Sequence, residues 1–364
     1  MKFFKFALPL ALALSTQGGV EANPLPIGER SVAAAADLAA STHELVARAP
    51  TTDAAFTVAT STVNSAITCP NGIAGRTGGV ILLVHGTGQT GQETWANGPY
   101  VSLLPNYSPG YDVCYVTLPS RSWQDAQTSS EYVARAVQIL APKSKTGTVS
   151  IIGHSQGNIN IQWALSFWPS IRPKVHQFVS LAGDFKGTLL AYLGCAANDL
   201  LAPGTGCQPS VLQQASNSRY LRVLKNAAGS ALVKTLSLST AYDEVVVPQS
   251  GTSGTSYLPG ATNVQLQQSN ICGALHPAGH ISMTIDPAAF ELAYETIRTG
   301  TTPMGSTFDK WSCFNFFFGT GYNNNTFAKT ADALQAAFQF ALGTASYPTT
   351  KTEPAIRSYA QAYL

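Results

Sequence analysis

The residues best suited to chemistry form the short run GHSQG at residues 153–157. This G-x-S-x-G motif directly follows an apolar stretch, Val149–Gly153, and directly precedes a helical pattern. The glycines allow a turn so tight that the serine hydroxyl stands above the end of the strand. The motif alone is common, but its position between a strand and a helix predicts a nucleophile elbow rather than a plain glycine-rich turn. Ser155 is therefore the predicted nucleophile.

A serine hydroxyl needs a histidine to remove its proton and a carboxylate to orient that histidine. After a nucleophile elbow the expected chain order is serine, acid, histidine, which leaves His176, His276 and His280 as candidates for the base. His176 comes too early and is expected at the surface. We favour His280, in a glycine-preceded loop before a helix that begins near Pro287; His276 could instead line the pocket or cap a turn. A zinc site at His276 and His280 is disfavoured, because neither a helical context nor a third ligand accompanies them.

The triad acid belongs in a loop just past a central strand. Asp243 and Glu244 both follow the predicted strand Leu232–Ser239 and both qualify. Asp243 is preferred because it comes first after the strand, and the next residue often turns outward. Asp184, after the predicted strand Val175–Leu181, is the competitor, and we expect it to line a pocket wall or a turn.

The oxyanion formed during acyl transfer needs backbone N–H donors that already point toward it. One is expected from Gln156, directly after the nucleophile, and another from the loop Val84–Gly91 after an earlier strand. The glycines of this loop let the backbone approach a substrate, and the Thr87 hydroxyl could add a donor. A phosphate-binding loop is the rival interpretation, but the Lys-Ser/Thr ending is absent.

Short apolar strands alternate with helical stretches along the chain, which predicts α/β layering around a buried, parallel sheet. The predicted strands are Gly79–His85, Val113–Leu118, Val149–Gly153, Val175–Leu181 and Leu232–Ser239, and the predicted helices include Ser130–Ala141, Asn158–Phe167 and Phe327–Leu342. No linker divides residues 51–298, so we expect one catalytic domain over residues 49–364.

The composition narrows the class of protein. The chain has 364 residues, 45% of them apolar, which supplies a large core. Only 11% are charged, the net charge is +2, and no basic run marks a nucleic-acid partner. No metal or organic cofactor is implied, and we expect a monomer.

The N-terminus predicts secretion. Lys2 and Lys5 precede the apolar run Phe6–Leu14, and a small-x-small site ends at Ala22, so residues 1–22 are interpreted as a signal peptide. The apolar run is too short for a transmembrane anchor. Residues 23–48 are a possible pro-segment.

The six cysteines, an even number behind a signal peptide, predict three disulfides in an oxidising compartment. Cys195 and Cys207 bracket a short loop and are expected to pair locally. The other cysteines, Cys69, Cys114, Cys272 and Cys313, could pair in sequence order.

Several segments together resemble the fungal lipases of the Candida antarctica lipase B family, in the α/β-hydrolase superfamily. The similar segments are Leu82–Gly88, Ser155–Gly157, Phe167–Arg172, Asp184–Thr188 and Asp243–Val246, and the similarity extends over residues 51–298. The resemblance implies an α/β-hydrolase fold, in which a mostly parallel sheet is flanked by helices, with a small lid insertion at about 189–209. By the same resemblance Ser155, Asp243 and His280 match the triad, and Thr87 with Gln156 matches the oxyanion hole. His280 keeps the family's spacing from Cys272, and Cys69 with Cys114 and Cys272 with Cys313 match two of its disulfides.

The resemblance also implies a function: a secreted lipase that acts on acylglycerols and related esters, at times at a lipid–water interface. We expect His154, Asp184 and Val245 to contact the substrate. His154 stands where the family's namesake has tryptophan, which predicts a wider and more polar alcohol pocket, and His85 replaces a proline. A short-chain esterase or acyltransferase shares this machinery. A non-catalytic binding protein on the same scaffold is disfavoured, because every triad and oxyanion position holds a competent residue.

Overall fold

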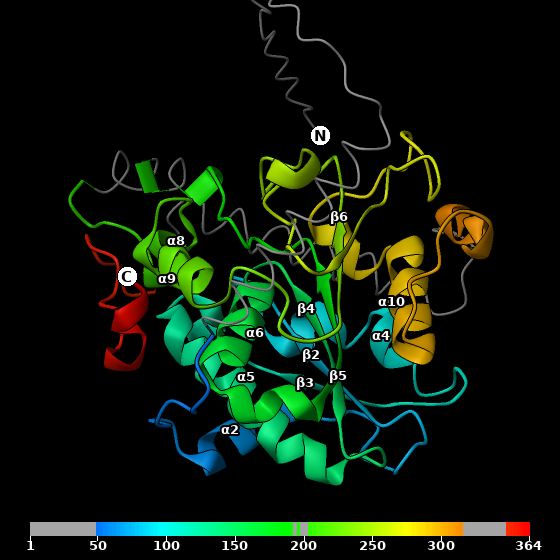
Figure 1. The fold of residues 1–364 in the computed structure, drawn as a ribbon, viewed down its shortest axis with the longest axis horizontal. Coiled ribbons are helices and arrows are strands. Elements are labelled where there is room, and N and C mark those ends of the chain that lie inside the picture. Colours follow the sequence, from blue (N-terminus) through cyan, green and yellow to red (C-terminus); the bar gives the residue numbers. More distant parts are fainter. Residues whose placement is uncertain (1–48, 192–194, 197–202, 316–346) are drawn as a thin grey trace, which may run out of the picture. The chain divides into compact units, whose positions relative to one another are not determined.

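The computed structural model describes residues 49–191, 195–196, 203–315 and 347–364, which all belong to one unit, Ser41–Leu364 (Figure 1). The proposed signal peptide and pro-segment lie outside the described residues, as do the predicted helix Phe327–Leu342 and residues 192–194 and 197–202 of the lid region. Among the described residues, no helix is long and apolar enough to cross a bilayer.

A seven-stranded sheet runs through this unit in the order β1-β3-β2-β4-β5-β6-β7. The strands are β1 (Ile67–Thr68), β2 (Val80–Val84), β3 (Asp112–Val116), β4 (Val149–His154), β5 (Val175–Leu181), β6 (Thr235–Ser239) and β7 (Thr262–Gln265). Only β1 pairs antiparallel, with β3. The residues of β2, β3 and β4 are all buried, as expected for parallel strands covered on both faces.

Helices cover both faces of the sheet (Figure 1). They are α2 (Thr60–Ala66), α3 (Gly91–Trp95), α4 (Pro99–Ser102), α5 (Ala126–Leu140), α6 (Gln156–Phe167), α8 (Pro209–Gln214), α9 (Arg219–Ala228) and α10 (Pro287–Thr299). Successive strand side chains point to opposite faces. Val80 and Leu82 therefore join the core under α5, α6 and α9, whereas Ile81 and Leu83 join the core under α4 and α10. The predicted mostly parallel α/β-hydrolase sheet flanked by helices is confirmed.

Short 3-10 helices also occur among the described residues. They are η1 (Pro119–Ser122), η2 (Ala141–Lys143), η3 (Pro169–Lys174), η4 (Gly251–Ser253), η5 (Ile281–Thr284), η6 (Gly305–Thr307), η7 (Lys310–Phe314) and η8 (Ser358–Tyr363).

Several predicted boundaries were wrong. The strand predicted from Leu232 begins at Thr235, because residues 232–234 form bends. The helix predicted from Ser130 begins at Ala126, since the Asp125 side chain caps it by accepting the N–H of Gln127 at 3.0 Å. The strands β1 and β7 were not predicted, because they are short and only partly buried.

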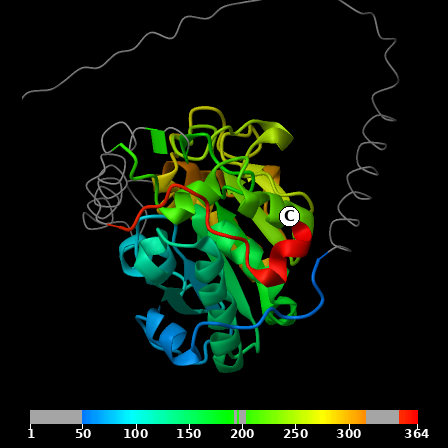
Figure 2. The same cartoon turned by 90° about the vertical axis from the view of Figure 1, so that its left-hand side faces the viewer.

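Three disulfides fasten the described residues: Cys69–Cys114, Cys195–Cys207 and Cys272–Cys313. All match the predicted pairings. Cys207 also pairs through its backbone with Thr350 near the C-terminus. The residues that follow, drawn red in Figure 2, lie against α6 and α9, where Trp163 donates to the Tyr359 hydroxyl and Asn226 donates to the Tyr363 carbonyl.

Candidate active site

Ser155 occupies the sharp turn between β4 and α6. Its backbone has φ 55° and ψ −132°, in the positive-φ region that a non-glycine residue adopts only under constraint. The constraint comes from the close approach of strand and helix: a Cβ on Gly157 would lie 2.7 Å from the Val84 carbonyl oxygen. The Ser155 N–H donates to the Leu181 carbonyl at 3.0 Å, which ties the turn to β5. The strand–turn–helix context predicted for this serine is present.

The loop after β2 passes directly beside Ser155. A Cβ on Gly86 would lie 2.7 Å from the Cβ of Ser155, so only glycine permits this approach. The next residue, Thr87, donates its hydroxyl to Gln156 Oε1 at 2.5 Å and accepts from Gln214 Nε2 at 3.1 Å. The two residues predicted for the oxyanion hole are therefore in direct contact, one residue away from Gly86 and Ser155 respectively. The hydrogen bond from Gln214, in α8, to Thr87 was not predicted, because nothing in the local sequence indicates it.

His85 organises the backbone of the same loop. Its Nε2 accepts the Leu118 N–H at 2.8 Å, so the proton is on Nδ1, which donates to the Gly86 carbonyl at 2.7 Å. Burial lowers the pKa of His85 to about 4, although the hydrogen bond to Gly86 opposes the change. His85 is therefore a neutral side chain whose two hydrogen bonds connect the loop after β2 to the chain after β3.

His280 and Asp243 form a buried hydrogen-bonded pair. Asp243 Oδ2 accepts from His280 Nδ1 at 3.0 Å, and Oδ1 accepts the N–H groups of Val245 and Val246 at 3.0 and 2.6 Å. Because the carboxylate is an acceptor, the proton of a neutral His280 sits on Nδ1 and the lone pair on Nε2. This is the tautomer that a general base requires.

The charges around His280 favour its protonated form. Burial alone would lower the pKa of His280, but the charge and hydrogen bond of Asp243, with the charges of Glu244 and Asp184, raise it above its usual range. These acidic groups therefore stabilise the imidazolium that forms when His280 accepts a proton.

Two further contacts fix the backbone of His280. Glu244 is exposed, and its Oε2 accepts the N–H of His280 at 2.8 Å. His154 Nε2 donates to the His280 carbonyl at 3.0 Å, and the two imidazole rings lie 4.9 Å apart. His154 directly precedes Ser155, so this contact joins the turn at the end of β4 to the His280 loop. Among the described residues no hydrogen bond links the Ser155 hydroxyl to His280; such bonds often tighten only when substrate binds.

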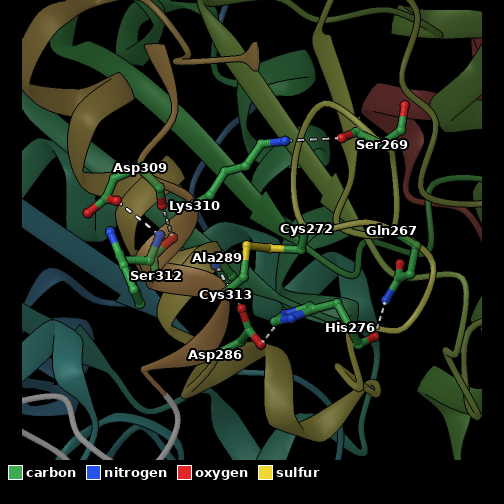
Figure 3. The surroundings of a disulfide bond; sticks show 11 residues. Gln267, Ser269, Cys272, His276, Asp286, Ala289, Asp309, Lys310, Ser312 and Cys313 are labelled. Atoms are coloured by element: carbon green, nitrogen blue, oxygen red, sulfur yellow. Dashed lines mark hydrogen bonds and ion pairs between the residues drawn. A yellow bond between two sulfur atoms is a disulfide. The ribbon is translucent and has the colours of Figure 1, made fainter. Parts of the chain in front are cut away.

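His276 has a different partner. Its Nε2 lies 2.8 Å from Asp286 Oδ2, and both residues are buried (Figure 3). The other Asp286 oxygen caps α10 by accepting the Ala289 N–H at 2.9 Å. The nearby disulfide Cys272–Cys313 fastens the same segment. His276 thus anchors its loop to α10 and contacts neither Asp243 nor Glu244 in the hydrogen bonds of the described chain. His176 is exposed, as predicted.

Asp184 follows β5 and is fully buried, yet neither of its carboxyl oxygens has a hydrogen-bond partner among the described residues. Burial raises the pKa of Asp184 to about 7, with Asp243 raising it further and His280 lowering it. Val245 is half-buried, and its carbonyl accepts the Thr188 hydroxyl at 2.6 Å. Sequence reasoning proposed both residues as substrate contacts but gave no sign of the unpaired carboxyl.

The arrangement suits acyl transfer: a serine on a strained turn, a histidine with a free Nε2, a carboxylate that orients it, and backbone N–H groups beside the serine. The described residues contain no group of three His, Cys, Asp or Glu side chains that could hold a metal ion.

Comparison with known proteins identifies the family of this chain. No family profile matches the sequence. The chain is 33% identical over 261 residues to lipase B of Pseudozyma antarctica, which covers 71% of this chain and 73% of that protein. Its fold is similar to the crystal structure of Aspergillus fumigatus lipase B, with a TM-score of 0.74 and 29% identity over 86% of this chain and 74% of the other. The chain therefore belongs to the lipase B family and is a carboxylic-ester hydrolase with the α/β-hydrolase fold.

Proposed function

We propose that Ser155 is the nucleophile of this hydrolase, His280 its general base and Asp243 the residue that orients the base. The observation that carries the proposal is the 3.0 Å hydrogen bond from His280 Nδ1 to Asp243, which leaves Nε2 free to accept a proton. The contact between His154 and the His280 carbonyl supports it, because it holds the histidine loop against the turn that bears Ser155.

In this mechanism the Ser155 hydroxyl oxygen attacks the ester carbonyl carbon while its proton passes to His280 Nε2. The carbonyl oxygen becomes an oxyanion, which the N–H groups of Gln156 and Thr87 stabilise. The Thr87 hydroxyl, which donates to Gln156 Oε1 in this structure, becomes a further donor when it turns toward the oxyanion. The alcohol leaves with the proton held by His280, and an acyl-enzyme remains. Water, activated by the same imidazole, then releases the carboxylic acid and restores Ser155.

The proposed substrates are acylglycerols and related esters, taken up in part at a lipid–water interface by a secreted, monomeric enzyme. Three disulfides are in keeping with secretion. We keep residues 189–209 as the proposed lid insertion, whose Cys207 end is buried in a cluster with Trp123 and Val211. His154, Asp184 and Val245 remain the proposed substrate contacts.

Labelling by a fluorophosphonate ester tests the nucleophile. We expect the wild type to be labelled and to lose activity, whereas Ser155→Ala should escape labelling, fold normally and lose about 10⁶-fold in kcat. An alanine variant with near-normal hydrolysis would refute the assignment. Turnover of emulsified triolein against soluble short-chain esters then separates a lipase from a short-chain esterase.

A further inference from the structure

The backbone of His280 is held by side chains at both its N–H and its carbonyl. Glu244 Oε2 accepts its N–H at 2.8 Å, and His154 Nε2 donates to its carbonyl at 3.0 Å. Each of these residues is the chain neighbour of a proposed catalytic residue: Glu244 follows Asp243, and His154 precedes Ser155. Two contacts to the backbone of one residue therefore link all three parts of the proposed triad.

Neither contact uses the imidazole of His280. Its Nδ1 is already bound to Asp243, and its Nε2 makes no hydrogen bond to another residue in the described part of the chain. Gly279 makes the Glu244 contact possible, since a Cβ at that position would lie 2.7 Å from Glu244 Oε2. The two contacts thus restrain the position of the His280 backbone without competing for the atoms that react.

The tautomer of His154 is also determined. A carbonyl can only accept, so His154 carries its proton on Nε2, and its Nδ1 has no partner among the described residues. Burial, with the nearby His280 and despite the favourable contact to the His280 carbonyl, lowers the pKa of His154 to about 3. His154 is therefore a neutral donor throughout the pH range in which an ester hydrolase with a histidine base works.

We propose that Glu244 and His154 are positioning residues that hold the His280 backbone at its N–H and at its carbonyl, so that Nε2 stays within reach of the Ser155 hydroxyl. The inference rests on the proposed role of His280 as base. It gives His154 a second role: this residue holds the backbone of His280, in addition to the contact with substrate that the sequence predicts. A displacement of about 1 Å between reacting groups can cost about 100-fold in rate, so a backbone restraint of this kind matters for kcat.

Glu244 offers the cleaner test, because it is exposed and its substitution need not disturb the core. The acidic groups that face His280 are Asp243, Glu244 and Asp184, whose own pKa is raised to about 7, while the neighbouring His154, and His85 beyond it, are neutral. Glu244→Gln keeps an oxygen that can accept the His280 N–H but removes the charge, whereas Glu244→Ala removes both. The pair separates the hydrogen bond from the electrostatic effect.

We expect Glu244→Ala to lower kcat about 10- to 100-fold with little change in KM, and Glu244→Gln to recover most of that loss. Both variants should move the acid limb of kcat/KM to lower pH, because removing a nearby negative charge lowers the pKa of His280. Glu295→Gln, which removes an acid paired with Arg298 on α10, is the matched control and should change neither quantity.

His154 is tested by Phe and Gln substitutions. Their kcat values are compared at temperatures equally far below each variant's melting temperature, or per active site titrated with a fluorophosphonate. His154→Gln keeps a donor for the His280 carbonyl and should retain more kcat than His154→Phe. Wild-type kcat in Glu244→Ala, or equal losses in Glu244→Ala and Glu244→Gln, would overturn the proposal. His280→Ala, measured alongside, tests the base itself: if that variant stayed active, the proposed function would fail, whatever the Glu244 variants did.

Discussion

The two halves of the candidate active site are held in place by different forces. Around Ser155 the restraints are steric and backbone-based: positive φ, a strand and a helix in van der Waals contact, and glycines at 86 and 157 where a Cβ would collide. Around His280 the restraints are side-chain hydrogen bonds from residues far apart in the chain, to Asp243, Glu244 and His154. At Gly86 and Gly157 the first half cannot accept an added side-chain atom without a shift of the backbone, whereas in the second half single hydrogen bonds can be removed.

The contrast predicts which property each substitution affects. Atoms added at the glycines beside Ser155 should act mainly on the ability of the chain to fold, because buried strands and helices must separate to accept them. A change near His280 should act mainly on rate and pH dependence, because it alters a proton acceptor and its charges. The predictions below test this division in order of decreasing effect.

Gly157→Ala should give the largest effect. Its Cβ would lie 2.7 and 2.8 Å from the carbonyl oxygens of Val84 and His85, which are backbone atoms of β2 and the following loop and cannot rotate away. We expect little or no folded enzyme, measured as soluble yield and as the cooperative unfolding transition by circular dichroism. Gly98→Ala is the control: its Cβ would meet nothing closer than 3.5 Å, and it should fold with near-normal stability. A stable, active Gly157→Ala enzyme would contradict the steric account of the turn.

Substitutions of the two buried histidines, His280 and His276, should affect different properties, the first mainly kcat and the second mainly the free energy of unfolding. His280→Ala removes the proposed base and should lower kcat by several orders of magnitude, with a smaller effect on the fold. His276→Ala leaves Asp286 buried without its partner, and breaking a buried pair costs about 3–5 kcal/mol. We therefore expect a strongly destabilised but catalytically competent enzyme, in urea unfolding and in kcat measured well below its melting temperature. The reverse pattern, with His276→Ala inactive and His280→Ala active, would exchange their roles.

The same division explains what could be predicted from sequence. The glycine and serine spacing and the apolar strands are local, so the turn at Ser155 and β5 were predicted closely. Predicting the Asp243–His280 pair required the chain order that the fold imposes and a family resemblance. The contacts of His154, Glu244 and His276 join residues that only tertiary packing brings together, and nothing in their local sequence indicates them. The start of α5 was missed because a capping Asp125 extends it past its apolar pattern.

Asp184 follows β5, the strand beside β4, and belongs to neither half of this comparison, because its carboxyl interacts with the charges of His280 and Asp243 but makes no hydrogen bond to another described residue. Its pKa is raised mainly by burial, from an ordinary 3.8 to about 7 in the folded protein. Between about pH 4 and pH 7 the folded chain therefore keeps a proton that the unfolded chain has lost. Since stability falls with rising pH wherever the folded state binds more protons, Asp184 should destabilise the enzyme progressively across this window and fully above it.

Asp184→Asn removes the titration while keeping the shape of the side chain. It should leave stability little changed near pH 4 and raise it by up to a few kcal/mol above pH 7, because a tenfold change in proton affinity corresponds to about 1.4 kcal/mol. The measurement is urea unfolding of both proteins, with disulfides intact, at intervals from pH 4 to pH 8. We expect the difference between the two stabilities to open across that range. If the curves ran parallel, Asp184 would not carry the raised pKa, and its buried carboxyl would have to be ionised at low pH by a partner that offsets its desolvation. Because neither carboxyl oxygen has a hydrogen bond among the described residues, we expect the curves to diverge.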